Sequence, residues 1–116
     1  MSLESQLQAR LLLAAPARLP SLRLFRRNIG EAKLRGGHTV SFGIKGQADL
    51  YGIVRGGRII EVELKAAGRQ LSLEQKQWQT WCLEWEIPHV VLRALKNESE
   101  VETVERWLTE LAQLLT

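Results

Sequence analysis

The chain has 116 residues, of which 45% are hydrophobic and 25% are charged, a composition typical of one globular domain with a single core. Its one cysteine excludes an internal disulfide, and no apolar run approaches the roughly 20 residues that cross a bilayer. No signal peptide precedes the first expected helix. We therefore expect a cytoplasmic protein with no membrane partner and one domain over residues 1–116.

The net charge is only +3, but residues 18–45 are distinctly basic. Against the single acid Glu31, this segment holds Arg18, Arg23, Arg26, Arg27, Lys33, Arg35 and Lys45. Such an asymmetry suits a polyanionic partner, because lysine and arginine neutralise phosphates. From charge alone, a solvated basic surface is an equally good interpretation.

The first expected element is an amphipathic helix over residues 2–14. Its leucines recur at helical spacing and two prolines close the segment: Leu3, Leu7 and Leu11, then Pro16 and Pro20. Two short mixed segments bounded by glycines follow, Leu22–Ile29 and Thr39–Phe42, which indicates a strand, a loop and a second strand.

The clearest hairpin pairs residues 48–54 with residues 58–65 around the turn Arg55-Gly56-Gly57. A helix then opens with Ser72 and Gln75 in a capping-box pattern, carries an apolar stripe and ends near Glu86. That stripe consists of Trp78, Trp81, Cys82 and Trp85, and the four tryptophans of the chain are expected in the core or an interface.

A short apolar strand over His89–Leu92 precedes the last helix, which begins with a capping box of Ser99 and Glu102. The stripe of this helix could serve the core or a partner: Val101, Val104, Leu108, Leu111 and Leu115. His38 and His89 lack the spacing of a metal pair. The order of elements predicts an α/β domain in which a hairpin meander is flanked by helices.

The strand over residues 58–65 places Glu61, Glu63 and Lys65 on one face, because alternate side chains share a face. If the turn has three residues, Asp49 lies opposite Glu63. A two-residue Gly-Gly turn would instead set Asp49 opposite Leu64, on the wrong face. The two carboxylates therefore meet only if the turn has three residues, if the strand has a bulge, or if Asp49 lies at the edge of the strand.

Paired carboxylates are destabilising unless a cation compensates them, and their oxygens suit Mg²⁺. Lys65 lies two residues beyond Glu63, roughly 6 to 7 Å along the strand on the same face. Two acids and a lysine make a hydrolytic site for a phosphodiester. The alternative is a solvated strand face on which Glu61, Glu63 and Lys65 form ordinary cross-strand pairs.

Several motifs together resemble the VRR-NUC family of the PD-(D/E)XK nuclease superfamily over residues 2–95. They are Gly46-Gln47-Ala48-Asp49, Glu63-Leu64-Lys65, Gly68, Leu71-Ser72 and Gln75 ahead of a tryptophan-bearing helix. Ala48 departs from the nominal proline at a position without a ligand role. The resemblance implies a restriction-endonuclease-like fold, with a central mixed β-sheet flanked by helices, an αβββαβ core and a C-terminal helix.

By resemblance, Asp49 and Glu63 are metal ligands, with the main-chain carbonyl of Leu64 as a further ligand and Lys65 as the catalytic lysine. Glu4 resembles the acid that the first helix contributes, although an acid in a first turn also complements the helix dipole.

Gln75 resembles a glutamine that faces the site, and capping explains it equally well, since its side chain is not expected to do both. Glu61 is left outside the ligand set as a peripheral acid. Arg26 and Arg27 resemble the basic stretch that meets phosphates, and Lys45 is a further expected DNA contact.

The resemblance implies a Mg²⁺-dependent DNA endonuclease of bacterial or phage type, in which Mn²⁺ can substitute. Members that consist of this domain alone resemble homodimers that cut four-way (Holliday) junctions, for which a twofold protein supplies paired cuts. Three alternatives stay open. They are a flap or duplex nuclease of the same fold, a non-catalytic DNA-binding module, and a small structural or interaction protein.

Overall fold

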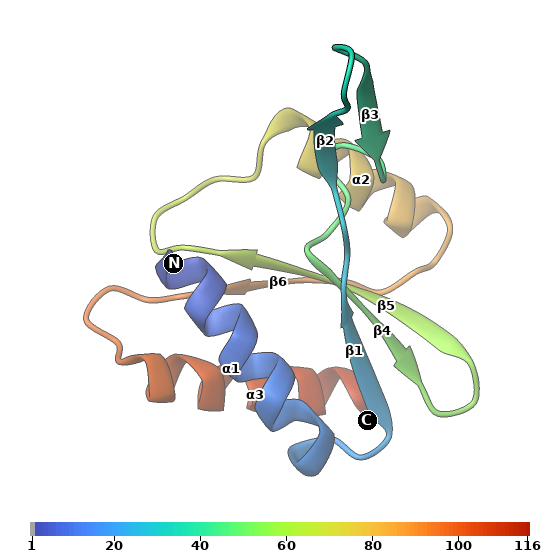
Figure 1. Ribbon diagram of the computed structural model, residues 1–116. Coiled ribbons are helices and arrows are strands. Elements are labelled where there is room, and N and C mark those ends of the chain that lie inside the picture. Colours follow the sequence, from blue (N-terminus) through green and yellow to red (C-terminus); the bar gives the residue numbers. More distant parts are fainter. Residues whose placement is uncertain (1) are drawn as a thin grey trace.

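The computed structural model describes residues 2–116 and places three helices and six strands in them (Figure 1). In chain order these are α1 (Leu3–Arg18), β1 (Leu22–Arg26), β2 (Gly30–Lys33), β3 (Thr39–Phe42), β4 (Leu50–Val54), β5 (Arg58–Lys65), α2 (Leu73–Glu84), β6 (His89–Arg93) and α3 (Glu100–Leu115). The expected α/β class, with a strand hairpin flanked by helices, is confirmed.

Four strands form one mixed sheet in the order β1-β4-β5-β6. Strands β1, β4 and β5 are antiparallel, whereas β6 runs parallel to β5 because α2 provides the crossover between them. Val54 lies opposite Arg58, which confirms the three-residue turn and excludes the two-residue one.

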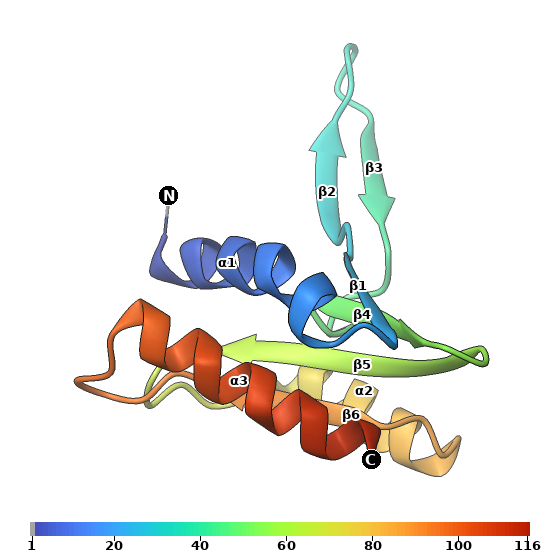
Figure 2. The ribbon, with the colours of Figure 1, turned by 90° about the horizontal axis from the view of Figure 1, so that it is seen from below.

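The alternation of side chains along β5 separates the two faces of the sheet. Ile60, Val62 and Leu64 enter the hydrophobic core, which lies between the sheet and the packed pair α1 and α3. Helix α2 lies on the other side of the sheet (Figure 2), where it contacts Glu61 and Glu63. The face with the carboxylates is therefore covered only in part, by a single helix.

Helix α1 runs through Pro16 to Arg18, so the expectation that this proline closes the helix was wrong. Proline removes one backbone donor, but the stripe of buried side chains continues past it, with Leu7, Leu11, Ala15 and Leu19 almost inaccessible. The Leu19 amide donates to the Ala15 carbonyl at 2.7 Å. Core packing on both sides of Pro16 thus holds the last turn.

Both expected capping boxes are present, Ser72 with Gln75 and Ser99 with Glu102. Helix α2 ends at Glu84, close to the expected end near Glu86, which has a φ of 57°. None of the helices within residues 2–116 combines the length and apolar character needed to cross a membrane.

The stripe of α3 serves the core: Val104, Leu108 and Leu111 are buried, whereas Val101 is exposed. Trp107 is buried beside them, and its indole Nε1 donates to the Arg93 carbonyl at 3.0 Å. Of the two places expected for the tryptophans, core or interface, Trp107 is in the core. On α2, by contrast, Trp81 and Trp85 are 39% and 66% exposed.

The strand expected over Leu22–Ile29 is shorter in the structure, where β1 ends at Arg26. Strand β2 was not expected, and it pairs with β3 in a separate two-stranded sheet. This hairpin, residues 30–42, projects from the body of the molecule (Figure 2). We call it the arm.

Candidate active site

Strand β5 brings two glutamates into the interior. Glu61 is 3% and Glu63 is 2% exposed, although both lie on the face away from the hydrophobic core. The alternative of a solvated strand face is therefore wrong for both residues. A buried carboxylate must be paired, protonated or held by a cation, so each one needs its own physical account.

Asp49 immediately precedes β4 and meets the end of β5. The ladder pairs Leu50 with Val62, so Asp49 is at the edge of the strand, next to Glu63. Its Oδ2 accepts a hydrogen bond from the Leu64 amide at 2.9 Å. The side chain of Leu64 is itself buried in the core, so only the main chain of Leu64 is available to the site.

The Glu63 carboxyl is buried and forms no ion pair within residues 2–116. Burial raises its pKa to about 9, together with hydrogen bonding to Asp49 and the charges of Asp49 and Glu4, while Lys65 opposes the shift. Its Oε2 has no hydrogen-bond partner within residues 2–116. The Glu63 carboxyl therefore keeps its proton near neutral pH unless a cation binds beside it.

The raised pKa of Glu63 predicts that the metal-free protein loses stability as pH rises from 5 towards 9. The folded state keeps a proton that an unfolded glutamate, with a pKa of 4.5, releases, so the free energy of unfolding declines across this window. We expect a slope steeper by roughly 1 kcal/mol per pH unit than that of Glu63→Gln.

Urea unfolding at several pH values between those limits, in EDTA, measures this slope for the wild type and for Glu63→Gln. The glutamine keeps the shape of the side chain and cannot titrate, so it serves as the matched control. Parallel pH profiles for the two proteins would contradict the pKa assigned to Glu63.

Gln75 performs both of the roles that we expected to exclude each other. Its Oε1 accepts the Ser72 amide at 2.8 Å in the capping box, while its Nε2 donates to Glu63 Oε1 at 3.4 Å. The expectation of one role or the other was wrong, because the two ends of one amide point in different directions. The start of α2 thereby positions Glu63.

Lys65 and Glu4 complete the surroundings of the acids. Lys65 ends β5 half-buried, and Glu4 is exposed in the first turn of α1. Partial burial and Asp49 raise the pKa of Glu4, while Lys65 and Arg69 lower it, so these side chains share one electrostatic neighbourhood. Arg69 was missed by the sequence analysis, and its place shortly after Lys65 was the only signal.

Asp49, Glu63 and Glu4 are the acids that could hold a divalent cation at this site. Within residues 2–116, no three His, Cys, Asp or Glu side chains are arranged as a ready metal cage. Asp49 and Glu63 nevertheless lie together and Glu63 Oε2 is unpaired, while Glu4 is solvent-exposed nearby. Two carboxylates with free oxygens fit Mg²⁺, which keeps several waters and takes few protein ligands.

Arg27 was expected to contact DNA, and the structure places it elsewhere. Its guanidinium forms a two-pronged ion pair with Glu61, at 2.5 and 3.0 Å, and is only 16% exposed. It also lies over the rings of Tyr51 and Trp78, and Trp78 Nε1 donates to Glu61 at 2.8 Å. Arg27 and Trp78 thus neutralise and satisfy the buried Glu61.

The other two expected DNA contacts are accessible. Arg26 is exposed at the end of β1, and the Lys45 side chain is 84% exposed. Lys45 Nζ lies 3.5 Å from Glu74, an exposed pair that contributes little and leaves the ammonium group in solvent.

Gly46 allows the loop before Asp49 to lie against α2. Its φ is +97°, and a Cβ there would meet the Glu74 carbonyl oxygen at 2.3 Å. Gly57 has the same φ of +97° with nothing within 4 Å, so it isolates the effect of backbone conformation.

We expect Gly57→Ala to cost about 1 to 2 kcal/mol and Gly46→Ala about 2 kcal/mol more, because overpacking adds to the strain. Urea unfolding of both variants measures the difference. Equal losses would show that the contact between Gly46 and α2 carries no energetic weight.

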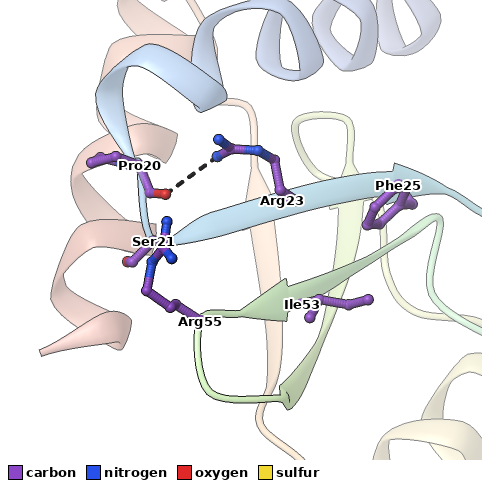
Figure 3. A pocket seen from close by; sticks show the side chains of 6 residues that line it. All are labelled: Pro20, Ser21, Arg23, Phe25, Ile53 and Arg55. Carbon is purple, nitrogen blue, oxygen red and sulfur yellow. Dashed lines mark hydrogen bonds between the residues drawn. The ribbon is translucent and has the colours of Figure 1, made fainter.

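An apolar hollow of about 280 Å³ lies on β1 and β4 (Figure 3). Pro20, Ser21, Arg23, Phe25, Ile53 and Arg55 line it, and Arg23 donates to the Pro20 carbonyl at 3.3 Å. The lining includes no carboxylate, imidazole or thiol. This hollow therefore offers no group for acid–base or nucleophilic chemistry.

Comparisons with known proteins find no relative of this chain. No family model matches the chain, and neither curated proteins nor solved structures give a match.

Proposed function

We propose that this protein is a Mg²⁺-dependent, structure-specific DNA endonuclease with the restriction-endonuclease-like fold of the PD-(D/E)XK superfamily, resembling the VRR-NUC family. The order of elements supports the fold. Leaving the arm aside, α1, the antiparallel strands β1, β4 and β5, the crossover helix α2 and the parallel strand β6 follow the αβββαβ core.

One observation carries the proposal: a buried glutamate, Glu63, lies against Asp49 with an unpaired oxygen, and Lys65 ends the same strand. Such an arrangement is unfavourable for stability alone, since two carboxyl groups are crowded together and neither forms an ion pair within residues 2–116. Perturbed carboxyl groups of this kind are typical of functional sites.

The residues of the chain divide the work. The Leu64 amide orients Asp49 and the Gln75 amide group orients Glu63, so both carboxylates are fixed before substrate arrives. Lys65 places an ammonium group beside them, where it can donate to the attacking water or to a phosphoryl oxygen. Preorganised charge of this kind stabilises the negative charge that develops on the phosphate.

Asp49 and Glu63 would hold Mg²⁺ or Mn²⁺, with the Leu64 carbonyl as a further ligand and Glu4 facing from α1. When bound, the ion supplies Lewis-acid polarisation of the phosphate and activation of a water. Two exposed cations, Arg26 and Lys45, are proposed to contact the DNA backbone.

A homodimer acting on four-way junctions belongs to the same proposal, because paired cuts across a junction need two identical sites. Exposed apolar side chains support an unfilled contact surface, among them Leu13, which is 84% exposed, and Val101, which is 59% exposed. A cytoplasmic setting is also proposed, in which the buried thiol of Cys82 stays reduced.

The test incubates the purified protein with labelled four-way junction, flap and linear duplex in Mg²⁺, Mn²⁺ or EDTA. Asp49→Asn is the matched variant, because an asparagine oxygen can still accept the Leu64 amide while the charge is lost. Paired, metal-dependent cuts in the junction that vanish in Asp49→Asn are the expected result.

Each other outcome has a definite meaning. Cutting of only the flap or the duplex would keep the chemistry and remove the junction. A folded protein that binds DNA but cuts nothing would be a non-catalytic DNA-binding module. A protein without salt-dependent DNA binding, and without a response of its stability to Mg²⁺, would be a structural or interaction protein.

A further inference from the structure

The arm has no role in the hydrophobic core. Strands β2 and β3 pair only with each other, and every residue from 30 to 43 is exposed except the half-buried Ala32. A two-stranded hairpin that buries so little is marginal by itself. Its projection (Figure 2) therefore calls for a binding partner as its explanation.

The arm rises from the candidate active site. The Arg27 amide donates to the Asp49 carbonyl at 2.9 Å, so the chain enters the arm beside the first acid. The chain returns through Gly43, where a Cβ would lie 3.0 Å from the Asn28 carbonyl oxygen, and reaches Asp49 six residues later. A molecule that lies along the arm is thus led to Asp49.

The charge of the arm is positive towards its tip. Lys33 ends β2 and Arg35 lies in the loop, and neither forms an ion pair within residues 2–116. Glu31 is the single acid of the arm. Exposed cations at the end of a projecting element suit a polyanion, because little desolvation or rearrangement is needed to reach phosphates.

We propose that the arm binds double-helical DNA by lying in its major groove, with Lys33 and Arg35 neutralising phosphates that flank the groove. The major groove is about 12 Å wide and admits a two-stranded β-ribbon. From Ile29 to Arg35 an extended chain reaches about 20 Å, enough to cross that groove. This inference rests on the proposed action on DNA and adds the element that grips the duplex.

The test compares two variants with the same loss of charge. Lys33→Gln/Arg35→Gln removes the cations of the arm, and Arg55→Gln/Arg58→Gln removes two exposed cations at the β4–β5 turn, outside the arm. Lys33→Arg/Arg35→Lys keeps the charge and exchanges its chemistry. All six substitutions are at exposed positions, so folding is preserved, and circular dichroism checks it.

Binding is measured by fluorescence anisotropy with a labelled duplex and a four-way junction, in EDTA, from about 50 to about 200 mM salt. We expect the arm variant to bind at least on the order of tenfold more weakly, with a slope of log K against log salt that falls by about 2. The turn variant and the charge-keeping variant should retain the wild-type slope.

An equal loss in the turn variant would reduce the effect to bulk charge and overturn the inference, as would a wild type that binds no duplex. An arm variant that binds DNA normally but no longer self-associates would assign the arm to a second copy of the chain instead. Cleavage separates this inference from the proposed function. If the wild type binds DNA through the arm but cuts nothing, only the proposed nuclease activity is refuted. If the arm variant binds DNA as the wild type does and the wild type cuts DNA, only the role of the arm is refuted.

Discussion

Lys65→Ala is expected to abolish Mg²⁺-dependent cleavage of DNA while DNA binding stays nearly intact. Lys65 ends β5, on the strand that carries Glu63, and its charge lowers the pKa of both Glu63 and Glu4. Loss of a positioned group that moves a proton or stabilises charge typically slows the chemical step by 10²- to 10⁴-fold. Binding depends on many phosphate contacts and hardly on one half-buried lysine.

The experiment measures single-turnover cleavage and equilibrium binding on the same labelled junction. Lys96→Ala, at an exposed lysine in the loop before α3, is the control for the lost charge. Unchanged cutting by folded Lys65→Ala would remove Lys65 from the mechanism. A parallel loss of binding and cleavage would assign it to substrate affinity.

A second readout does not depend on activity. Because the Lys65 charge opposes the rise in the pKa of Glu63, its removal should raise that pKa further. The window in which stability declines with pH should therefore extend to higher pH in Lys65→Ala, while its lower end, fixed by the unfolded glutamate, stays unchanged. An unchanged upper end of this window would mean that Lys65 does not act electrostatically on Glu63.

The central geometry was predictable because it depends on local rules. A three-residue turn fixes the register of β4 and β5, and strand alternation then brings Asp49 to Glu63. The two capping boxes located the starts of α2 and α3 for the same reason, since serine and the residue three positions later act within one helical turn.

The misses depend on contacts between distant segments. Arg27 and Glu61 are separated by 34 positions, so a run of basic residues gave no sign that one of them is buried. The turn of α1 after Pro16 persists because Ala15 and Leu19 are packed in the core. Rules based on helical periodicity and on proline use neighbouring residues alone. They do not include the contacts with the sheet and the core packing that decide these two cases.

The arm was missed because its sequence lacks the signal used to find strands. Residues 30–33 include a glycine and two charged residues, and no side chain of the arm is fully buried. Hydrophobic alternation identifies a strand that packs against a core. A projecting ribbon has no such face, so its pairing follows from the Gly36-Gly37 loop rather than from periodicity.

Arg27→Met is expected to destabilise the protein by about 3 to 5 kcal/mol, the range for a buried ion pair that loses one partner. Glu61 would remain buried with only the Trp78 indole as a hydrogen-bond donor from a side chain. A carboxylate left unpaired in the interior takes up a proton, so the loss should grow as pH rises above the ordinary range of glutamate.

Arg18→Met is the matched control, because Arg18 contacts Glu105 at 2.6 Å, about as closely as Arg27 contacts Glu61. Unlike the buried pair, the side chains of Arg18 and Glu105 are both about half exposed. An exposed pair contributes less than about 1 kcal/mol, so chemical denaturation should separate the two variants clearly. Arg27→Met/Glu61→Leu should recover part of the loss by removing the buried charge, while Trp78 Nε1 stays unpaired. Equal effects of Arg18→Met and Arg27→Met would show that Arg27 is not needed to neutralise Glu61, and would return it to the surface cations available to DNA.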